Sequence, residues 1–376
     1  MEADSVISGG LPSEIICFQI LPRLPTKFVI RCRCVCKSWS SLTRNPSFLT
    51  VHRSFRCSPS THLLFTTSDE TTTTLQHFHS VKLNQEEGEK NIINPTTDLF
   101  SLPAPSYSFL GGTHSINGLT ILADQLNAKT VYVFNPCTEQ IITLPHTSLV
   151  AELFTHHLGF SAVTNEYKVF QVHWSGNEDY PNYVTSLRFK IFTLGTTTWR
   201  HIELDFPFDP ERLDFAKKSV CLHGGIHWMH MNQKIIVAFD VGAERFRDNI
   251  PLPGDCDSGN IVEVGGCVAV YDDTSLFQQD MILLWILEDY QNHVWVKKNI
   301  IFTSSWEKLG CPIPLGTIHT GELLLKPTLR DSANVSVHLY NIESDSFRKC
   351  KISLPVKIGL WSLLTSYDES VITLRS

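Results

Sequence analysis

The segment from Leu11 to Trp39 constrains this chain most, because it predicts apolar helices that are too short to bury themselves. Its first apolar side chains follow the three-and-four spacing of one helix face, at Ile16, Cys17, Ile20, Leu21 and Leu24. Ser13 is a candidate N-cap, and Pro22 and Pro25 end this helix. Chains below about 40 residues usually need a partner, a metal or disulfides to fold. The segment is therefore predicted to be a docking element.

Two further short helices are expected after the first. One runs from Thr26 to about Cys34, and the next passes through Cys36 and Leu42 before Asn45-Pro46 ends it. The chain is accordingly divided into a disordered N-terminus (1–10), helices (11–48), a linker (49–60) and a large domain (61–376).

The paired Leu-Pro motifs at Leu11-Pro12 and Leu24-Pro25, with the ending Cys-Val-Cys-Lys-Ser-Trp at 34–39, resemble an F-box. One residue more than usual separates the two Leu-Pro pairs, so a shifted first turn is expected near Ser13 to Ile15. The resemblance implies docking on a Skp-family adaptor and, through it, a cullin scaffold. The adaptor-binding residues that it implies are Leu11, Pro12, Ile16, Ile20, Leu21, Leu24, Pro25, Val35 and Trp39. The alternative is an ordinary amphipathic hairpin packed on the large domain.

Composition narrows the class of partner and the compartment. The formal net charge of −7 argues against nucleic acid, since phosphate binding needs a cationic surplus. The longest apolar run, Met281 to Leu287, is far shorter than the roughly 20 residues of a membrane span, and no signal peptide is expected.

The 11 cysteines are expected to be reduced, and no metal site is predicted at Cys32, Cys34 and Cys36. The expected location is the cytoplasm, the nucleus or both.

Beyond the linker the sequence changes to short β-rich runs. A recurring unit combines an apolar strand, an Asn, Asp or Thr turn, a second strand with an aromatic residue and often Leu-Pro. Its turns fall at residues 94, 135, 193, 240, about 288 and 341. Such periods suit propeller blades, which take roughly 40–50 residues each. The predicted fold is mostly β, a three-helix N-terminus followed by a β-propeller-like domain of about six antiparallel blades.

Further motifs resemble the F-box-associated domain of plant F-box proteins. They are Phe134-Asn135-Pro136, Leu158-Gly159-Phe160, Glu166-Tyr167-Lys168-Val169 and Gly225-Ile226-His227-Trp228. That family is kelch-like or propeller-like, and the resemblance implies a substrate receptor of an SCF-type ubiquitin ligase. The stretch His114 to Ile116 departs from the family pattern, whereas the Asn117-Gly118 turn remains.

No catalytic residue or cofactor is predicted. The histidines at 223, 227 and 230 are the best metal candidate, but Gly224-Gly225 predicts a hairpin turn that puts His223 and His227 on opposite strands. Signatures of common hydrolases and of nucleotide or dinucleotide binding are missing. Two alternatives stay open, a kelch-like propeller enzyme with a metal cofactor and an interaction scaffold without a ligase.

Candidate substrate contacts lie in two segments rich in aromatic, Gly and Pro residues, 174–182 and 306–314. Exposed loops of this composition commonly carry binding residues. We therefore predict that Trp174, Tyr180 and Trp306 face a protein substrate, with plain surface loops as the alternative.

Overall fold

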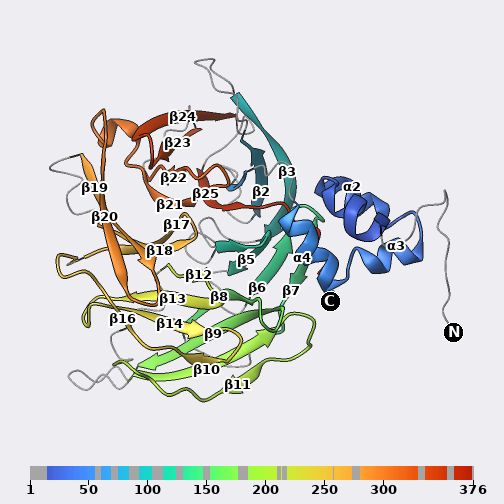
Figure 1. Cartoon of the computed structure of the whole chain (residues 1–376), viewed down its shortest axis with the longest axis horizontal. Coiled ribbons are helices and arrows are strands. Elements are labelled where there is room, and N and C mark those ends of the chain that lie inside the picture. Colours follow the sequence, from blue (N-terminus) through green and yellow to red (C-terminus); the bar gives the residue numbers. More distant parts are fainter. Residues whose placement is uncertain are drawn as a thin grey trace.

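The computed structural model describes residues 15–55, 61–68, 75–83, 93–103, 113–123, 130–146, 153–176, 185–209, 213, 218–256, 258–272, 280–328, 335–353 and 360–374. A ring of β-sheets forms the large domain, and short helices lie at one side of it (Figure 1). None of the helices in these ranges is long and apolar enough to cross a membrane.

The described strands form five sheets, and the eight-stranded one divides at the parallel β24–β3 contact into two antiparallel blades, which gives six in agreement with the predicted repeat. The blade that joins the two ends of the domain consists of β25 (Leu360–Tyr367), β1 (His62–Ser68), β2 (Leu75–Lys82) and β3 (Ile93–Pro103). The second consists of β4 (Thr113–Ile116), β5 (Leu119–Ala123), β6 (Val131–Asn135) and β7 (Gln140–Thr143). The third consists of β8 (Leu153–Ser161), β9 (Glu166–Gly176), β10 (Thr185–Thr193) and β11 (Arg200–Ile202).

The other three blades follow in chain order. The fourth consists of β12 (Val220–Leu222), β13 (Gly225–His230), β14 (Ile235–Asp240), β15 (Arg245–Phe246) and β16 (Ile250–Pro251). The fifth consists of β17 (Asn260–Val264), β18 (Cys267–Asp272), β19 (Met281–Asp289) and β20 (Val294–Ile301). The sixth consists of β21 (Ile313–Thr317), β22 (Leu323–Lys326), β23 (Val335–Asn341) and β24 (Ser346–Ser353).

The ring closes in two ways. The C-terminal strand β25 pairs antiparallel with β1, which begins the domain, and β24 pairs in parallel with β3 over three residues. The first predicted turn, at residue 94, is wrong. Asn94 lies inside β3, and its side-chain amide donates to the Lys351 carbonyl oxygen at 2.9 Å. The β25–β1 pairing extends along both strands, whereas the β24–β3 pairing covers only Ile93 to Pro95 of β3, so the first contact is the main closure of the ring.

The repeated Asn or Asp marks the hairpin between the third and fourth strands of a blade. Side-chain oxygens of Asn135, Asp240, Asp289 and Asn341 accept backbone N–H groups two or three residues on, at 2.7–3.0 Å. Such Asx-turns reverse the chain within a few residues. The sequence repeat is therefore a hairpin repeat.

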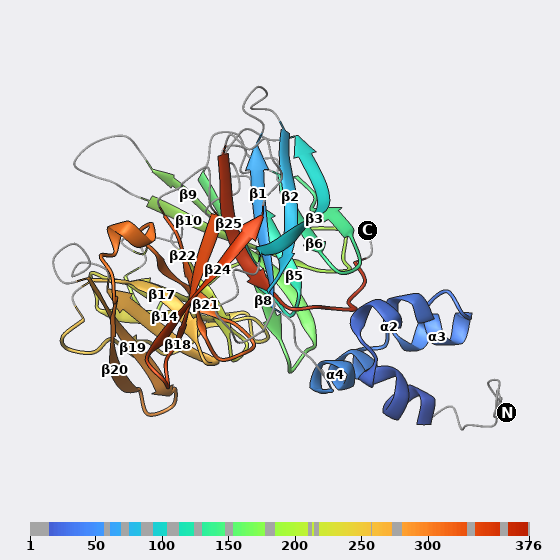
Figure 2. The same cartoon turned by 90° about the horizontal axis from the view of Figure 1, so that it is seen from above.

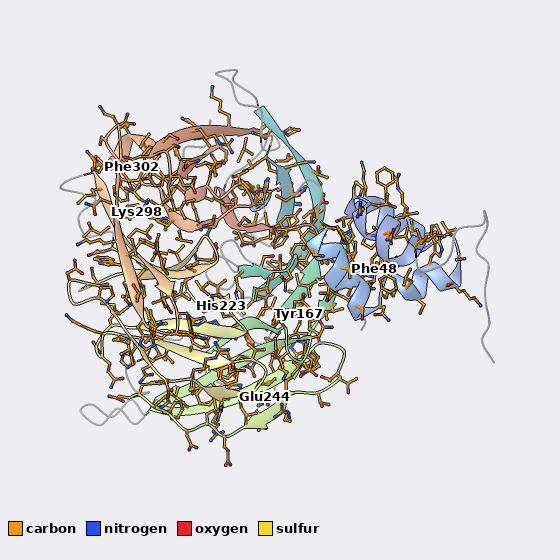
Figure 3. The ribbon with its side chains drawn as sticks, in the orientation of Figure 1. Phe48, Tyr167, His223, Glu244, Lys298 and Phe302 are labelled. Atoms are coloured by element: carbon orange, nitrogen blue, oxygen red, sulfur yellow. The ribbon has the colours of Figure 1, made fainter. Side chains whose placement is uncertain are left out.

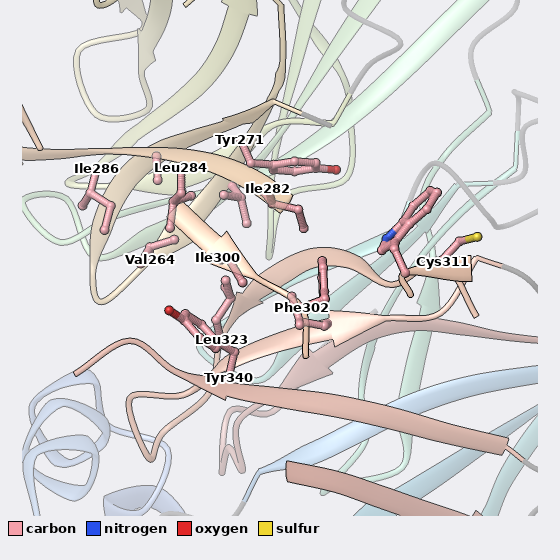
Figure 4. Packing of buried hydrophobic residues seen from close by; sticks show 14 residues of the cluster. Val264, Tyr271, Ile282, Leu284, Ile286, Ile300, Phe302, Cys311, Leu323 and Tyr340 are labelled. Carbon is pink, nitrogen blue, oxygen red and sulfur yellow. The ribbon is translucent and has the colours of Figure 1, made fainter. Parts of the chain in front are cut away.

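The repeated tryptophans join neighbouring blades. Trp199 in the third blade donates its indole N–H to the Pro145 carbonyl after the second blade, at 2.8 Å. Trp295 in the fifth blade donates to the Pro251 carbonyl of the fourth, at 3.0 Å. Apolar clusters fill the spaces between blades, for example where Tyr271 and Leu284 of the fifth blade approach Leu323 and Tyr340 of the sixth (Figure 4).

The helical part has one helix more than predicted. A π-helical turn η1 (Ile16–Ile20) and a 3-10 turn η2 (Leu21–Arg23) precede α2 (Thr26–Cys32), α3 (Lys37–Leu42) and α4 (Pro46–Ser54). The expected linker is wrong at 49–54, because Asn45 caps α4 by accepting the Ser47 N–H at 2.8 Å and Pro46 begins it. The second helix also ends two residues earlier than expected. A further 3-10 turn, η4 (Glu307–Leu309), follows β20.

One buried carboxylate gives the sixth blade a measurable pH dependence. Burial opposes ionisation of Glu322, but two hydrogen bonds from Arg348 and one from Thr320, all 2.6 Å long, outweigh it and lower the pKa of Glu322. Ionised Glu322 therefore stabilises the fold at pH values above its pKa in the unfolded chain. This stabilisation is lost as the pH falls through its lower pKa in the folded protein.

We therefore expect Glu322→Gln to lower the free energy of unfolding at pH 7 by about 1–3 kcal/mol. Urea unfolding of both proteins at pH 7 and near pH 3 measures the difference. The difference in unfolding free energy should be smaller near pH 3. An equal difference at both pH values would contradict a stabilising role for ionised Glu322.

Candidate functional site

The N-terminal helices enclose a small core of their own. Ile16, Leu21, Val29 and Phe48 are at most 7% exposed and pack together (Figure 3 labels Phe48). Val371 completes this core at 2% exposure, although it comes from the C-terminal segment. The helical unit is therefore finished by residues from the opposite end of the chain.

The C-terminal segment, residues 368–374, fastens the helices to the propeller (Figure 2). On the helical side, Arg33 donates to the Val371 carbonyl oxygen. On the propeller side, the Asn135 amide donates to the carbonyls of Ser370 at 3.1 Å and Ile372 at 2.8 Å. Gly118 (φ 78) lies so close to Asp368 and Ser370 that a Cβ at this position would clash with them. The segment thus runs across the propeller face that carries the short hairpin turns.

The outer surface of the helical unit is unusually apolar. Nine large apolar side chains are exposed in the described part of the chain, and five of them lie in residues 15–55: Phe18, Ile20, Phe28, Val35 and Phe55. Their exposed fractions run from 36% at Phe55 to 66% at Val35. A concentration of exposed apolar side chains on a folded unit indicates an interaction surface.

The predicted adaptor-binding residues divide into three groups in the structure. Ile20, Val35 and Pro25 are exposed, whereas Ile16 and Leu21 are buried in the core of the helical unit. Leu24 and Trp39 are partly buried against the same core. Leu11 and Pro12, like the proposed cap Ser13, lie outside the described residues.

Sequence reasoning missed Phe18 and Phe28 as surface residues, which are 47% and 43% exposed. Phe18 lies off the three-and-four stripe that ends at Leu24, and that offset could have identified it, whereas Phe28 follows Leu24 by four residues and has no such offset. Cationic side chains flank the apolar ones: the Lys27 and Arg31 charges lie 5.4 and 5.8 Å from the Phe28 ring centre. The surface therefore combines exposed aromatic rings with positive charge.

The predicted substrate residues are placed differently. Trp174 lies within β9, which continues to Gly176, and the side chain of Trp174 and the whole of Tyr180 are outside what the structure describes. The exposure expected at Trp306 is wrong: this side chain is 6% exposed, and its indole N–H donates to the Pro312 carbonyl at 2.9 Å. Trp306 is a core residue between the fifth and sixth blades.

The two faces of the ring differ in their connections. The turns at Asn117-Gly118 and His223-Gly224 belong to the short-turn face, with positive φ at all four residues. A hairpin is present where one was predicted, but its turn is His223-Gly224 and not Gly224-Gly225, so the placement of His223 on a strand was wrong. The strand ends on the opposite face are joined through longer segments, including residues 124–129 and 177–184. Longer connections on one rigid face commonly carry binding residues.

The histidines of the fourth blade serve hydrogen bonding in the core. His227 Nε2 lies 2.8 Å from the Tyr290 hydroxyl, and His230 Nε2 lies 2.9 Å from the Asp209 carbonyl oxygen. Burial lowers the pKa of His227 to about 4, so it is neutral at physiological pH. Among residues that the structure describes, no three His, Cys, Asp or Glu side chains gather as a metal site would require.

A β-propeller that carries a short helical unit with exposed apolar side chains is the architecture of this chain. Residues 62–359 match the model of the F-box associated beta propeller domain, and residues 9–56 match an F-box-like model. The chain therefore belongs to the F-box associated β-propeller family and is a plant-type F-box protein. The recognition role general to F-box proteins follows from this pairing of domains.

Similar proteins agree with this assignment. The F-box protein At4g19940 of Arabidopsis thaliana is 24% identical over 365 residues, covering 91% of this chain and 85% of its own. The F-box protein DOR of the same plant is 25% identical over 372 residues, covering 91% and 88%. Among solved structures, a chain of a nidogen/laminin complex aligns at 12% identity and a TM-score of 0.45, over 83% of this chain and 100% of that one.

Proposed function

We propose that this protein is the substrate-recognition subunit of an SCF-type ubiquitin ligase. In this proposal the helical unit docks on a Skp-family adaptor, which connects it to a cullin scaffold, in the cytoplasm or the nucleus. The observation that carries the proposal is the group of exposed apolar side chains on an F-box-like segment, above all Ile20 and Val35 at 40% and 66% exposure. Apolar side chains at the centre of an interface supply most of its binding energy.

The propeller would hold a protein substrate on the face opposite its short turns. The C-terminal segment contacts the short-turn face beside Gly118 and Asn135, so an adaptor docked on the helices would leave the strand ends of the opposite face to the substrate. The chain itself would contribute no acid, base or nucleophile. Its effect is proximity, because a held substrate presents its lysines at a raised effective concentration.

Binding to a purified Skp-family adaptor tests the proposal. Ile20→Asp with Val35→Asp places two charges in the proposed dry interface and should weaken binding roughly 10- to 100-fold. Both side chains are exposed, so the helices should stay folded, which circular dichroism checks. Substituting Leu21 instead would test folding, since it is 2% exposed.

A matched control uses two equally apolar and exposed side chains of the propeller. Val163→Asp with Ile301→Asp changes positions that are 95% and 59% exposed and should leave adaptor binding unchanged. Wild-type protein that is folded but does not bind the adaptor would overturn the proposal. An equal loss of adaptor binding in both double variants would mean that two added negative charges weaken binding wherever they lie, and that this surface has no special role.

A further inference from the structure

The helical unit has an unbalanced positive charge. Residues 15–55 contain seven Lys and Arg and not one Asp or Glu, whereas the whole chain has 31 Lys and Arg against 38 Asp and Glu. None of Arg33, Lys37 and Arg44 forms an ion pair with an Asp or Glu within the described ranges. Within the described part of the chain these three charges therefore have no carboxylate partner.

Three of these cations surround an open hollow at the start of α3. Arg33, Lys37 and Arg44 line it together with the hydroxyls of Ser40 and Ser41. Burial, followed by the neighbouring Arg44 charge, lowers the pKa of Arg33 to about 10. Two positive charges are thus close enough to repel each other, and an anion in the hollow would relieve that repulsion.

The hollow adjoins the proposed adaptor surface. Cys34 and Cys36, which also line it, are the chain neighbours of Val35, the most exposed apolar side chain of the helical unit. A protein that covers Val35 must therefore lie beside the hollow. A complementary partner would carry negative charge at that place.

The hydrogen bonds of the arginines favour an acidic polypeptide over a compact anion. Arg33 already donates to the Thr43 carbonyl at 3.3 Å and to the Val371 carbonyl, and Arg44 donates to the Ser40 carbonyl at 2.9 Å. These bonds hold the two guanidinium groups in separate places, each turned toward backbone carbonyls, while their charges still attract anions. Several carboxylates along a chain suit such a spread of charge better than one small ion.

We infer that this cationic hollow receives an acidic segment of the adaptor, and that the attraction speeds association of the two proteins. The inference rests on the proposed function, because it takes the occupant from the protein that docks beside Val35. Charges at the rim of an interface act mainly on the association rate and on its salt dependence.

Association kinetics of the full chain with a purified Skp-family adaptor test this inference. At about 50 mM NaCl, Lys37→Gln with Arg44→Gln should lower the association rate constant roughly three- to tenfold, with dissociation nearly unchanged. At about 500 mM NaCl the difference should vanish, because salt screens exposed charges. Arg44 bonds back to Ser40 of α3 from the turn after that helix, so its substitution could loosen the helix end. Lys37→Gln alone avoids this risk and should give a smaller effect of the same kind.

Lys308→Gln is the control, as it removes one exposed positive charge from the propeller and should change nothing. Association that is independent of salt and of these substitutions, yet lost in the Ile20→Asp, Val35→Asp variant, would overturn this inference alone. Stronger inhibition by sodium phosphate than by sodium chloride at equal ionic strength would identify a compact anion site and also overturn it. No binding at any salt concentration would overturn the proposed function and this inference together.

Discussion

Replacing Phe48 by alanine is expected to unfold the N-terminal helices while the propeller stays folded. Phe48 is 0% exposed and packs with Leu21, Val29 and Val371 at the centre of the helical core. Truncation of a buried phenylalanine leaves a cavity and costs about 3–5 kcal/mol. A helical unit of this size has little stability to spare, so most of its structure should be lost.

Hydrogen exchange of the α2 to α4 amides measures this effect as a loss of their protection from exchange. Adaptor binding should decrease together with that protection. Phe55→Ala is the matched control, because Phe55 caps the end of α4 and is 36% exposed. It should leave the protection of these helices nearly unchanged. Protection that survives in the Phe48 variant would mean that the propeller contacts alone hold the helices in place.

Asn135→Ala is expected to release the C-terminal segment from the propeller. Asn135 is 0% exposed, donates to two carbonyls of that segment and accepts the Cys137 N–H at 2.9 Å. Its removal leaves buried acceptors without donors, at a cost of about 2–4 kcal/mol. Because Val371 belongs to the helical core, we expect the helices to loosen as well.

Asn341→Ala separates this effect from the loss of a turn. Asn341 accepts the N–H groups of Glu343 and Ser344 in an equivalent hairpin and makes no such bond to the C-terminal segment in the described structure. It should cost about 1 kcal/mol. Hydrogen exchange of residues 368–374 should rise in the Asn135 variant only, and an equal rise in both would contradict the role of Asn135.

Local sequence patterns predicted the features that depend on near neighbours. The Asx-turn residues at 135, 240 and 341 and the period between them sufficed for a propeller of about six blades. The proline-bounded helices were placed to within a few residues. The repeat failed at Asn94, because an asparagine inside a strand looks the same in sequence as one in a hairpin turn.

Contacts between distant residues could not be predicted. The bond from Arg33 to Val371 joins residues 338 positions apart, and no local pattern indicates that Val371 completes a helical core. The burial of Trp306 likewise depends on a neighbouring blade. The buried face of each helix was harder still to predict, since a short helix next to another surface can bury either side. Leu21 is buried, whereas its neighbour Ile20 is exposed.

Residues 360–374 supply both the strand β25 that closes the ring and Val371 of the helical core, although they follow the helices and the other strands of the ring in the sequence. Neither unit can reach its final form until these residues have been synthesised, whereas domains generally fold from the N-terminus onward. A premature stop codon ahead of residue 360 would leave the ring open and the helices unsupported. Under the proposed function, such truncated chains should compete poorly for the adaptor with chains that contain residues 360–374.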